Sequence, residues 1–284
     1  MADDVASVIA QDGYRLQYRV WRAGPSMPKG DLVFLNGVMS HSGWFGPIAP
    51  LLAQRGFKVI GADRRGTGTN MTQRGDAPSA QALIDDVLRI IDAERTPGSP
   101  LYLVGWCWGT VLAINVAFRI AKELAGLSLL APGLFPSNEL KTRMSAQQAV
   151  ALGSAEGDAR LASPISEEMF TEGPSLQTFI LRDELRLRAF SPRFHQIVLR
   201  MGLNAARRLP QLDLPTLLVL AEQDRATDNE QTIRAFQAMG RHLSVAWCKG
   251  SHGMQFDAPE ELVGHLTSWI DANATGAGRN VCGS

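Results

Sequence analysis

The sequence predicts an α/β fold in which a mostly parallel central sheet has helices on both faces and carries a helical cap insertion. Short apolar runs alternate with segments of helical periodicity, the alternation stops over residues 137–209, and it then resumes. Such alternation is typical of parallel sheets that are covered on both faces. We therefore expect a core formed by residues 1–136 and 210–273, a cap formed by residues 137–209, and a disordered tail at residues 274–284.

The predicted strands are short apolar runs that end at turn-forming residues such as Asn36 and Gly37. In chain order these strands are Tyr14–Trp21, Asp31–Leu35, Phe57–Gly61, Pro100–Val104, Leu127–Leu130, Thr216–Leu220 and Leu243–Trp247. The predicted core helices, which carry apolar residues at helical spacing, are Ala80–Ala93, Gly109–Leu124 and Pro259–Ala272. The segment expected to form the cap has mixed polarity and is interrupted by prolines.

Composition favours a globular protein, since 45% of the 284 residues are hydrophobic and 20% are charged. The 28 basic and 28 acidic residues leave no excess charge to neutralise phosphates, so nucleic acid is not an expected partner. No apolar run is long enough for stable membrane insertion, and the acidic N-terminus lacks the features of a signal peptide. The three scattered cysteines form neither a disulfide framework nor a metal pair. We expect a cytoplasmic protein that needs no metal or other cofactor.

A G-x-C-x-G motif follows one predicted strand and precedes a helix. It reads Gly105-Trp106-Cys107-Trp108-Gly109, a cysteine version of the G-x-S-x-G turn that presents a nucleophile. The glycines make room for a strained turn, and the positive end of the following helix favours a thiolate. Cys107 is thus the predicted nucleophile. A buried core cysteine is the plainer interpretation, and a serine replaced by cysteine would leave the same pattern.

A base and an orienting acid follow in the order that such a nucleophile needs. Asp224 comes just after the strand Thr216–Leu220, where catalytic groups of open parallel sheets gather. His252 lies in the loop after the last strand, which fits the order nucleophile, acid, base. We predict a Cys107-His252-Asp224 triad, with Asp228 as the alternative acid.

These motifs resemble the α/β-hydrolase superfamily. The elbow, the turn Leu35-Asn36-Gly37-Val38, the run from Asp63 to Gly68, and the acid and base segments occur in that superfamily's order. The chain is most similar to its monoacylglycerol-lipase and lysophospholipase-like branch, although the cysteine departs from that branch, where serine is the rule. Dienelactone hydrolases and polyhydroxyalkanoate synthases carry a similar cysteine motif but differ in length. The resemblance implies an α/β-hydrolase fold.

The resemblance also implies an oxyanion hole. Its two backbone N–H groups would be those of Trp108, which follows the nucleophile, and Val38, in the turn where relatives have His-Gly-x. Trp106, His41 and Trp44 are the predicted walls of the substrate pocket, because they lie close in sequence to the elbow or to this turn.

Three functions fit these residues. The first is an acyl hydrolase or thioesterase that cleaves a carboxylic ester or thioester through an acyl-thioester enzyme intermediate. The second is an acyltransferase or cyclase that uses the same triad on a carrier-bound biosynthetic intermediate. In both, the partner is a small-molecule acyl substrate, either free or bound to a carrier or CoA. The third is a non-catalytic ligand receptor on a hydrolase fold.

Overall fold

The computed structural model describes residues 4–24, 26–153 and 160–277 of the chain. An eight-stranded sheet has the order β1-β2-β4-β3-β5-β6-β9-β10. The strands from β4 to β10 in this order run parallel, while β2 pairs antiparallel with both β1 and β4. The bounds of the eight strands are β1 (Asp4–Ile9), β2 (Arg15–Trp21), β3 (Asp31–Leu35), β4 (Lys58–Ala62), β5 (Leu101–Trp106), β6 (Leu124–Leu130), β9 (Thr216–Ala221) and β10 (Leu243–Cys248). This is the predicted α/β-hydrolase fold.

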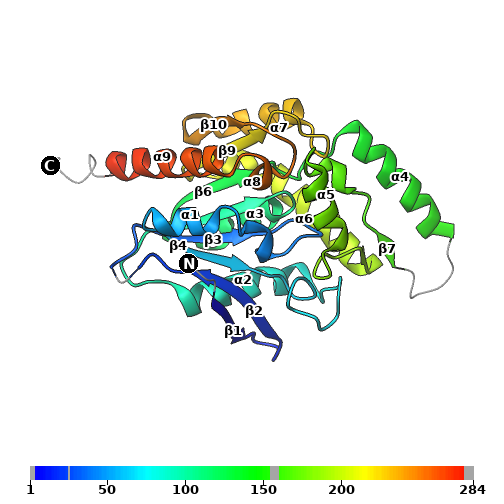
Figure 1. Ribbon diagram of the computed structural model, residues 1–284, viewed down its shortest axis with the longest axis horizontal. Coiled ribbons are helices and arrows are strands. Elements are labelled where there is room, and N and C mark those ends of the chain that lie inside the picture. The colour runs from blue at the N-terminus through cyan, green and yellow to red at the C-terminus, as the bar shows by residue number, and fades with distance from the viewer. Residues whose placement is uncertain (1–3, 25, 154–159, 278–284) are drawn as a thin grey trace.

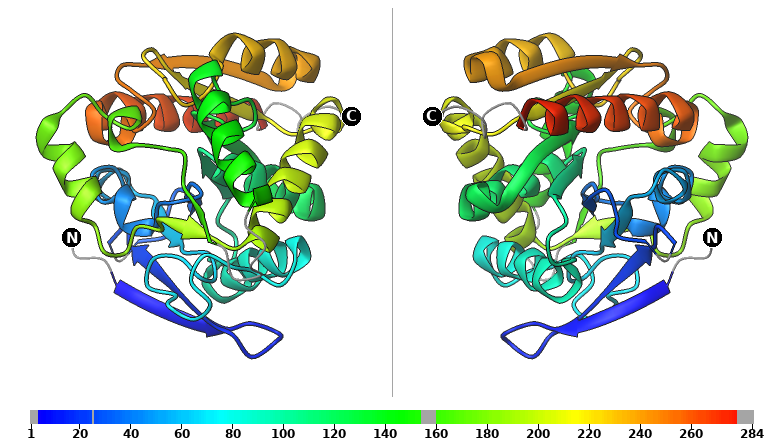
Figure 2. Two further views of the ribbon diagram at one scale, coloured as in Figure 1. Left: turned by 90° about the vertical axis from the view of Figure 1, so that its right-hand side faces the viewer. Right: turned by 90° about the vertical axis from the view of Figure 1, so that its left-hand side faces the viewer.

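Helices cover both faces of the sheet, as predicted (Figure 2). Helices α1 and α9 pack together on one face, and α2 and α3 pack together on the other. The helices outside the cap are α1 (Ala49–Gln54), α2 (Ala80–Glu94), α3 (Gly109–Ile120), α7 (Asn229–Phe236), α8 (Met254–Asp257) and α9 (Pro259–Ala277). The central strands β3 and β5 are buried along their whole length, which explains their continuous apolar sequence.

Several predicted boundaries were wrong. Strand β1 was missed because its residues are mostly exposed at the edge of the sheet, so its sequence has no apolar run. Helix α3 ends at Ile120, and a 3-10 turn leads into β6, which starts at Leu124 rather than Leu127. Helix α9 continues to Ala277, through residues 274–277 of the predicted tail, because the small residues there include alanine, the best helix former. The rest of that tail lies outside the described residues.

The described residues between β6 and β9 contain three α-helices, and we call residues 138–208 the cap. It comprises α4 (Asn138–Gly153), α5 (Pro174–Arg182), α6 (Pro192–Arg208) and the two short strands β7 (Leu161–Ala162) and β8 (Ala189–Phe190). Figure 1 shows the cap at one end of the molecule, on the side toward which β3 and β4 point.

The chain that leads into the cap is fixed to a loop of the core. Pro136 forms an antiparallel bridge with Thr227. On either side of it, the N–H of Ser137 donates to the carbonyl of Ala226 at 3.0 Å, and the N–H of Asp228 donates to the carbonyl of Phe135 at 2.8 Å. These bonds hold the base of the cap against the loop that follows β9.

Candidate active site

Cys107 occupies a strained turn between β5 and α3. Its φ angle is +57°, in the left-handed region that side chains other than glycine rarely adopt. A Cβ atom on Gly109 would lie 1.9 Å from the carbonyl oxygen of Leu35, and one on Gly105 would lie 2.6 Å from the carbonyl oxygen of Gly109. The turn therefore requires both glycines of the predicted motif.

Backbone hydrogen bonds hold this turn against the end of β6. The N–H of Cys107 donates to the carbonyl of Leu130 at 3.0 Å. The carbonyl of Cys107 accepts from the N–H of Gly133 at 2.9 Å and from that of Thr110 at 3.1 Å. Gly133 was not predicted as part of the site. The signal was present in the glycine that follows β6, where a Cβ would lie 2.8 Å from the nitrogen of Trp108.

Asp224 and His252 form a buried pair beside this turn. The Nδ1 atom of His252 lies 2.9 Å and 3.1 Å from the two carboxylate oxygens of Asp224, and both side chains are fully buried. Asp224 also accepts hydrogen bonds from the N–H groups of Ala226 and Thr227 and from the hydroxyl of Thr227. Asp228, the alternative acid, instead caps the N-terminus of α7 by accepting from the N–H of Gln231.

The electrostatics of this pair favour a charged imidazole. Burial by itself would raise the pKa of Asp224, but the charge and hydrogen bond of His252 outweigh it and lower that pKa. Burial would likewise lower the pKa of His252, yet the Asp224 carboxylate and the nearby Cys107 raise it well above its ordinary value. The buried Nε2 of His252 has no hydrogen-bond partner among the described residues. This nitrogen is therefore available to a group in the site.

Two backbone N–H groups near Cys107 are also free. Within the described ranges, neither the N–H of Val38 nor that of Trp108 donates to a protein acceptor. A Cβ built on Gly37, the residue before Val38, would lie 3.3 Å from the Sγ atom of Cys107, so this turn passes directly beside the sulfur. Unpaired donors on both sides of a nucleophile are the arrangement that binds an oxyanion.

A largely apolar cavity of about 330 Å³ opens beside Cys107. Cys107, Val38, Trp108 and His252 line it, and the cap supplies more than half of all its lining residues. The cap residues that line it include Leu140, Met144, Leu161, Ile165, Phe190, His195, Val198, Leu199 and Leu203. The volume falls at the lower end of the range for small-molecule sites.

Trp106, His41 and Trp44 do not line this cavity, contrary to the prediction. Trp106 is the last residue of β5, and its indole donates to the carbonyl of His252 at 2.9 Å. Trp44 and Trp106 are buried in an aromatic cluster, and their ring centroids lie 5.9 Å apart. Closeness in sequence was misleading for Trp106 because side chains of successive residues in a strand point to opposite faces. His41 and Trp44 instead contact Asp183 of the cap.

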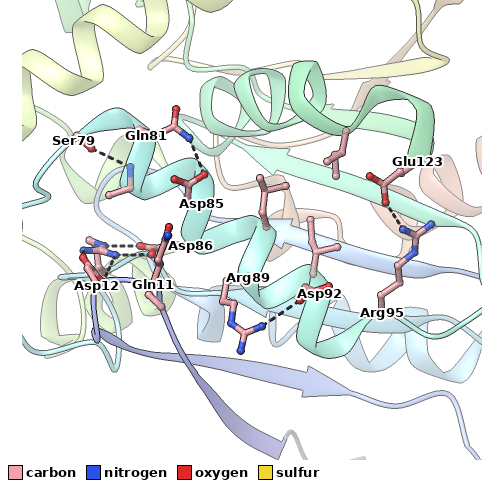
Figure 3. A pocket seen from close by; sticks show the side chains of 16 residues that line it. Gln11, Asp12, Ser79, Gln81, Asp85, Asp86, Arg89, Asp92, Arg95 and Glu123 are labelled. Atoms are coloured by element: carbon pink, nitrogen blue, oxygen red, sulfur yellow. Dashed lines mark hydrogen bonds and ion pairs between the residues drawn. The ribbon is translucent and has the colours of Figure 1, made fainter.

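A second hollow, of about 680 Å³, lies beside α2 and away from the triad (Figure 3). Its charged side chains largely pair with one another, as Arg89 does with Asp92 and Arg95 with Glu123. Among the described residues, no group of three His, Cys, Asp or Glu side chains is arranged to hold a metal ion. The search of those same residues finds no helix long and apolar enough to cross a membrane.

Comparison with known proteins agrees with the fold. The sequence matches the family described as "Serine aminopeptidase, S33" over residues 26–258. It is 26% identical to human monoglyceride lipase, over 97% of this chain and 93% of that protein. It is 25% identical to phospholipase YtpA of Bacillus subtilis, over 85% of this chain and 94% of that one. The fold is similar to that of a soluble variant of monoglyceride lipase from Saccharomyces cerevisiae, with a TM-score of 0.83, 14% identity and 96% of each chain covered.

Proposed function

The chain belongs to the serine aminopeptidase S33 family of α/β-hydrolases, and from this premise we propose that it hydrolyses small carboxylic esters or thioesters with Cys107 as nucleophile. One observation carries the proposal: Cys107, the buried His252, and Val38 and Trp108 with their free N–H groups all line the same apolar cavity. The names of its relatives, monoglyceride lipase and phospholipase, support an acyl ester as substrate.

In the proposed reaction, the sulfur of Cys107 attacks the carbonyl carbon of the ester and a tetrahedral intermediate forms. The two N–H groups stabilise its oxyanion. His252, held by Asp224, takes the thiol proton or already carries it, and then gives it to the leaving alcohol or thiol. Water, deprotonated by His252, attacks the resulting acyl-thioester, and expulsion of the Cys107 sulfur releases the acid.

The cavity supports an acyl group as the part of the substrate that the protein holds. Its walls are mostly aliphatic and aromatic, so a hydrocarbon chain loses contact with water there without leaving a polar group unpaired. We expect chains of moderate length to react faster than acetyl esters and faster than chains too long for about 330 Å³.

Intact-protein mass spectrometry tests this proposal. The protein is incubated with p-nitrophenyl esters, monoacylglycerols and acyl thioesters of increasing chain length. We expect an adduct of acyl mass that is absent from Cys107→Ala and present in Cys248→Ala. Cys248 is the matched control, because it is a free and fully buried cysteine whose pKa burial raises to about 12. Absence of both adduct and turnover across the whole series would refute the proposal.

The cysteine itself favours a second candidate, acyl transfer to an acceptor other than water. A thioester reacts readily with amines and carbon nucleophiles, so the same intermediate serves an acyltransferase or a cyclase. Adding amine or thiol acceptors to the assay decides between the two functions. Acyl transfer predicts an acylated acceptor as the main product, with Cys107→Ser shifting the products toward the free acid. Hydrolysis predicts free acid with every acceptor.

A further inference from the structure

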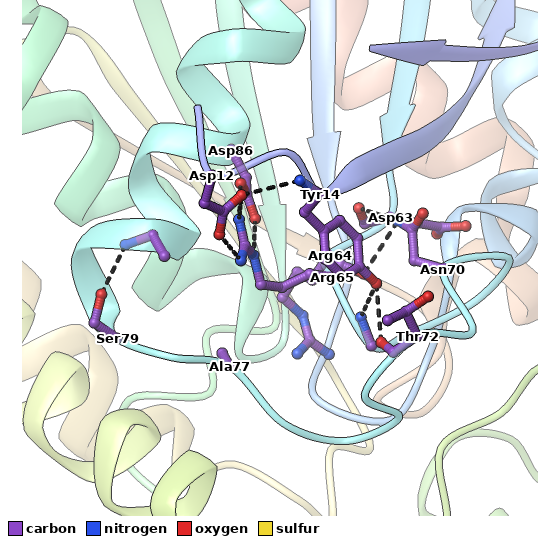
Figure 4. Close-up of polar contacts among 12 residues, drawn as sticks. Asp12, Tyr14, Asp63, Arg64, Arg65, Asn70, Thr72, Ala77, Ser79 and Asp86 are labelled. Atoms are coloured by element: carbon purple, nitrogen blue, oxygen red, sulfur yellow. Dashed lines mark hydrogen bonds and ion pairs between the residues drawn. The ribbon is translucent and has the colours of Figure 1, made fainter. Parts of the chain in front are cut away.

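Arg64 is buried without an acidic partner. Its side chain is 4% exposed, and no carboxylate of the described residues lies within ion-pair distance of it. The carboxylate of Asp63 accepts instead from the N–H groups of Ser42 and Thr69. Arg65, the next residue, pairs with Asp86 and Asp12 (Figure 4). A buried cation is costly unless its charge is used or compensated, so the position of Arg64 calls for an explanation.

The guanidinium of Arg64 holds the turn that contains Val38. Its Nη2 atom donates to the carbonyl of Gly37 at 2.9 Å and to the carbonyl of Val38 at 2.7 Å. The carbonyl of Gly37 and the N–H of Val38 are opposite ends of one peptide group. Because a trans peptide is planar, fixing its carbonyl toward Arg64 directs its N–H the other way. A charged donor on the carbonyl also polarises the peptide and strengthens its N–H as a donor.

Arg64 also contacts the other half of the oxyanion hole. Its guanidinium carbon lies 5.0 Å from the ring centroid of Trp108 and 5.3 Å from that of Phe194 in α6. These cation–π contacts hold the guanidinium beside the residue whose N–H is the second donor. One side chain therefore touches both residues that supply the oxyanion hole, and the cap helix α6 as well.

Arg64 keeps its charge at neutral pH, beside the residue that follows Cys107. Burial lowers the pKa of Arg64 to about 10, against the opposing influence of Asp63 and Cys107. Two of its nitrogens, Nε and Nη1, are buried without an acceptor among the described residues. A positive charge so poorly compensated by the protein favours negative charge that develops nearby, on the sulfur of Cys107 or on the oxyanion.

We propose that Arg64 is a positioning residue for catalysis: it orients and polarises the Val38 peptide, and its cation stabilises the negative charge that forms at Cys107 and in the oxyanion hole. This inference rests on the function proposed above. It concerns the tetrahedral intermediate rather than the bound substrate, so loss of Arg64 should lower kcat and leave KM almost unchanged.

The test compares Arg64→Met, Arg64→Lys and Arg186→Met with the unmodified protein. Methionine removes the charge and both hydrogen bonds but retains an apolar chain beside the two rings, whereas lysine keeps the charge and can donate hydrogen bonds. Arg186 is the matched control, because it is 7% exposed and its ion pair is with Glu167 of the cap. Each variant is assayed for kcat and KM on the best ester. Each is also assayed for inhibition by a trifluoromethyl ketone, to whose carbonyl the thiol adds to form a tetrahedral adduct.

For Arg64→Met we expect kcat to fall about 100-fold with KM within threefold, as for loss of an oxyanion donor. The inhibition constant of the ketone should rise by a similar factor, and Arg64→Lys should recover part of both losses. Burst titration counts the acylated sites, so a partly unfolded variant shows fewer sites but an unchanged rate per site.

Two results would overturn the inference. If Arg64→Met keeps kcat per site and the inhibition constant of the ketone within threefold of the unmodified protein, the role assigned to Arg64 is refuted while the proposed function stands. If the unmodified protein neither turns over any ester nor binds the ketone, the proposed function fails, and this inference fails with it.

Discussion

The Nε2 atom of His41 lies 2.8 Å from the carboxylate of Asp183, although 142 residues separate them in the chain. The same carboxylate oxygen accepts from the indole N–H of Trp44 at 2.6 Å. The Nδ1 atom of His41 accepts from the N–H of Gly43, so the ring donates to Asp183 through Nε2. Asp183 follows α5 in the cap, while the other two residues follow the turn at Val38. This contact therefore ties the cap to the core next to the active site.

Replacing Asp183 with alanine should lower the free energy of unfolding by about 2 to 4 kcal/mol at pH 7, because two buried donors lose their acceptor. Hydrogen bonds from His41 and Trp44 outweigh the effect of burial and lower the pKa of Asp183 to about 2. The stabilisation is thus present above about pH 4 and is lost as the pH falls toward 2. Urea unfolding should show a smaller difference in the free energy of unfolding between Asp183→Ala and the parent at pH 2.5 than at pH 7.

Asp213→Ala is the control for this prediction. Asp213 also lies 2.8 Å from a histidine, His242, but its side chain is 86% exposed. Its loss should cost less than about 1 kcal/mol, as is usual for surface pairs. Equal losses of unfolding free energy in Asp183→Ala and Asp213→Ala would show that burial does not strengthen the contact of Asp183 with His41.

Asp224→Asn should reduce kcat about 10⁴-fold, because the amide neither stabilises a charged His252 nor holds the productive tautomer. The comparison variant is Asp228→Asn, four residues along the chain. Asp228 accepts only at the start of α7, so its replacement should leave kcat within a few-fold. Steady-state kinetics with a p-nitrophenyl ester checks both. If kcat fell more in Asp228→Asn than in Asp224→Asn, Asp228 would be the acid that orients His252.

The stability of the protein should depend on pH through His252. Folding raises the pKa of His252. The stabilisation from its charged ring is therefore fully present below the pKa of the unfolded chain, near 6.5, and is lost as the pH rises through the pKa of the folded protein. The free energy of unfolding of the parent should therefore fall relative to that of His252→Gln between pH 6.5 and pH 9.5. Urea titrations across this range provide the measurement. A difference that stays constant or grows with pH would show that His252 is neutral in the folded protein.

Gly109→Ala should prevent the protein from folding or cost more than about 3 kcal/mol, since the added Cβ meets the backbone of Leu35 at 1.9 Å. The contrasting variant is Gly264→Ala in α9, where the new atom meets nothing within 4 Å. That change should stabilise the protein by roughly 0.5 to 1 kcal/mol through the higher helix propensity of alanine. Thermal denaturation followed by circular dichroism distinguishes the two, and a folded Gly109→Ala of normal melting temperature would contradict the packing described.

Sequence alone predicted the parts of the molecule that depend on local chemistry. The turn at Cys107 and the strand ends that carry Asp224 and His252 have short signatures, because strained backbone and buried strands restrict which residues fit. The structure places the Nδ1 atom of His252 2.9 Å from a carboxylate oxygen of Asp224.

The remaining features depend on long-range packing that no local pattern encodes. Arg64 lies in the run from Asp63 to Gly68, and its contacts with Val38 and Trp108 emerge only in three dimensions. The same holds for His41, whose partner Asp183 comes from the cap. A buried arginine is invisible in sequence because exposure is the usual fate of this residue type.

The bridge between Pro136 and Thr227 has a consequence for how this protein can diverge. It fixes the root of the inserted helices to the loop that bears Asp224, so changes farther out in the insertion leave the acid in place. Substitutions among the cap residues that line the cavity, such as Leu140, Met144 and Val198, can therefore reshape its wall while Asp224 keeps its place.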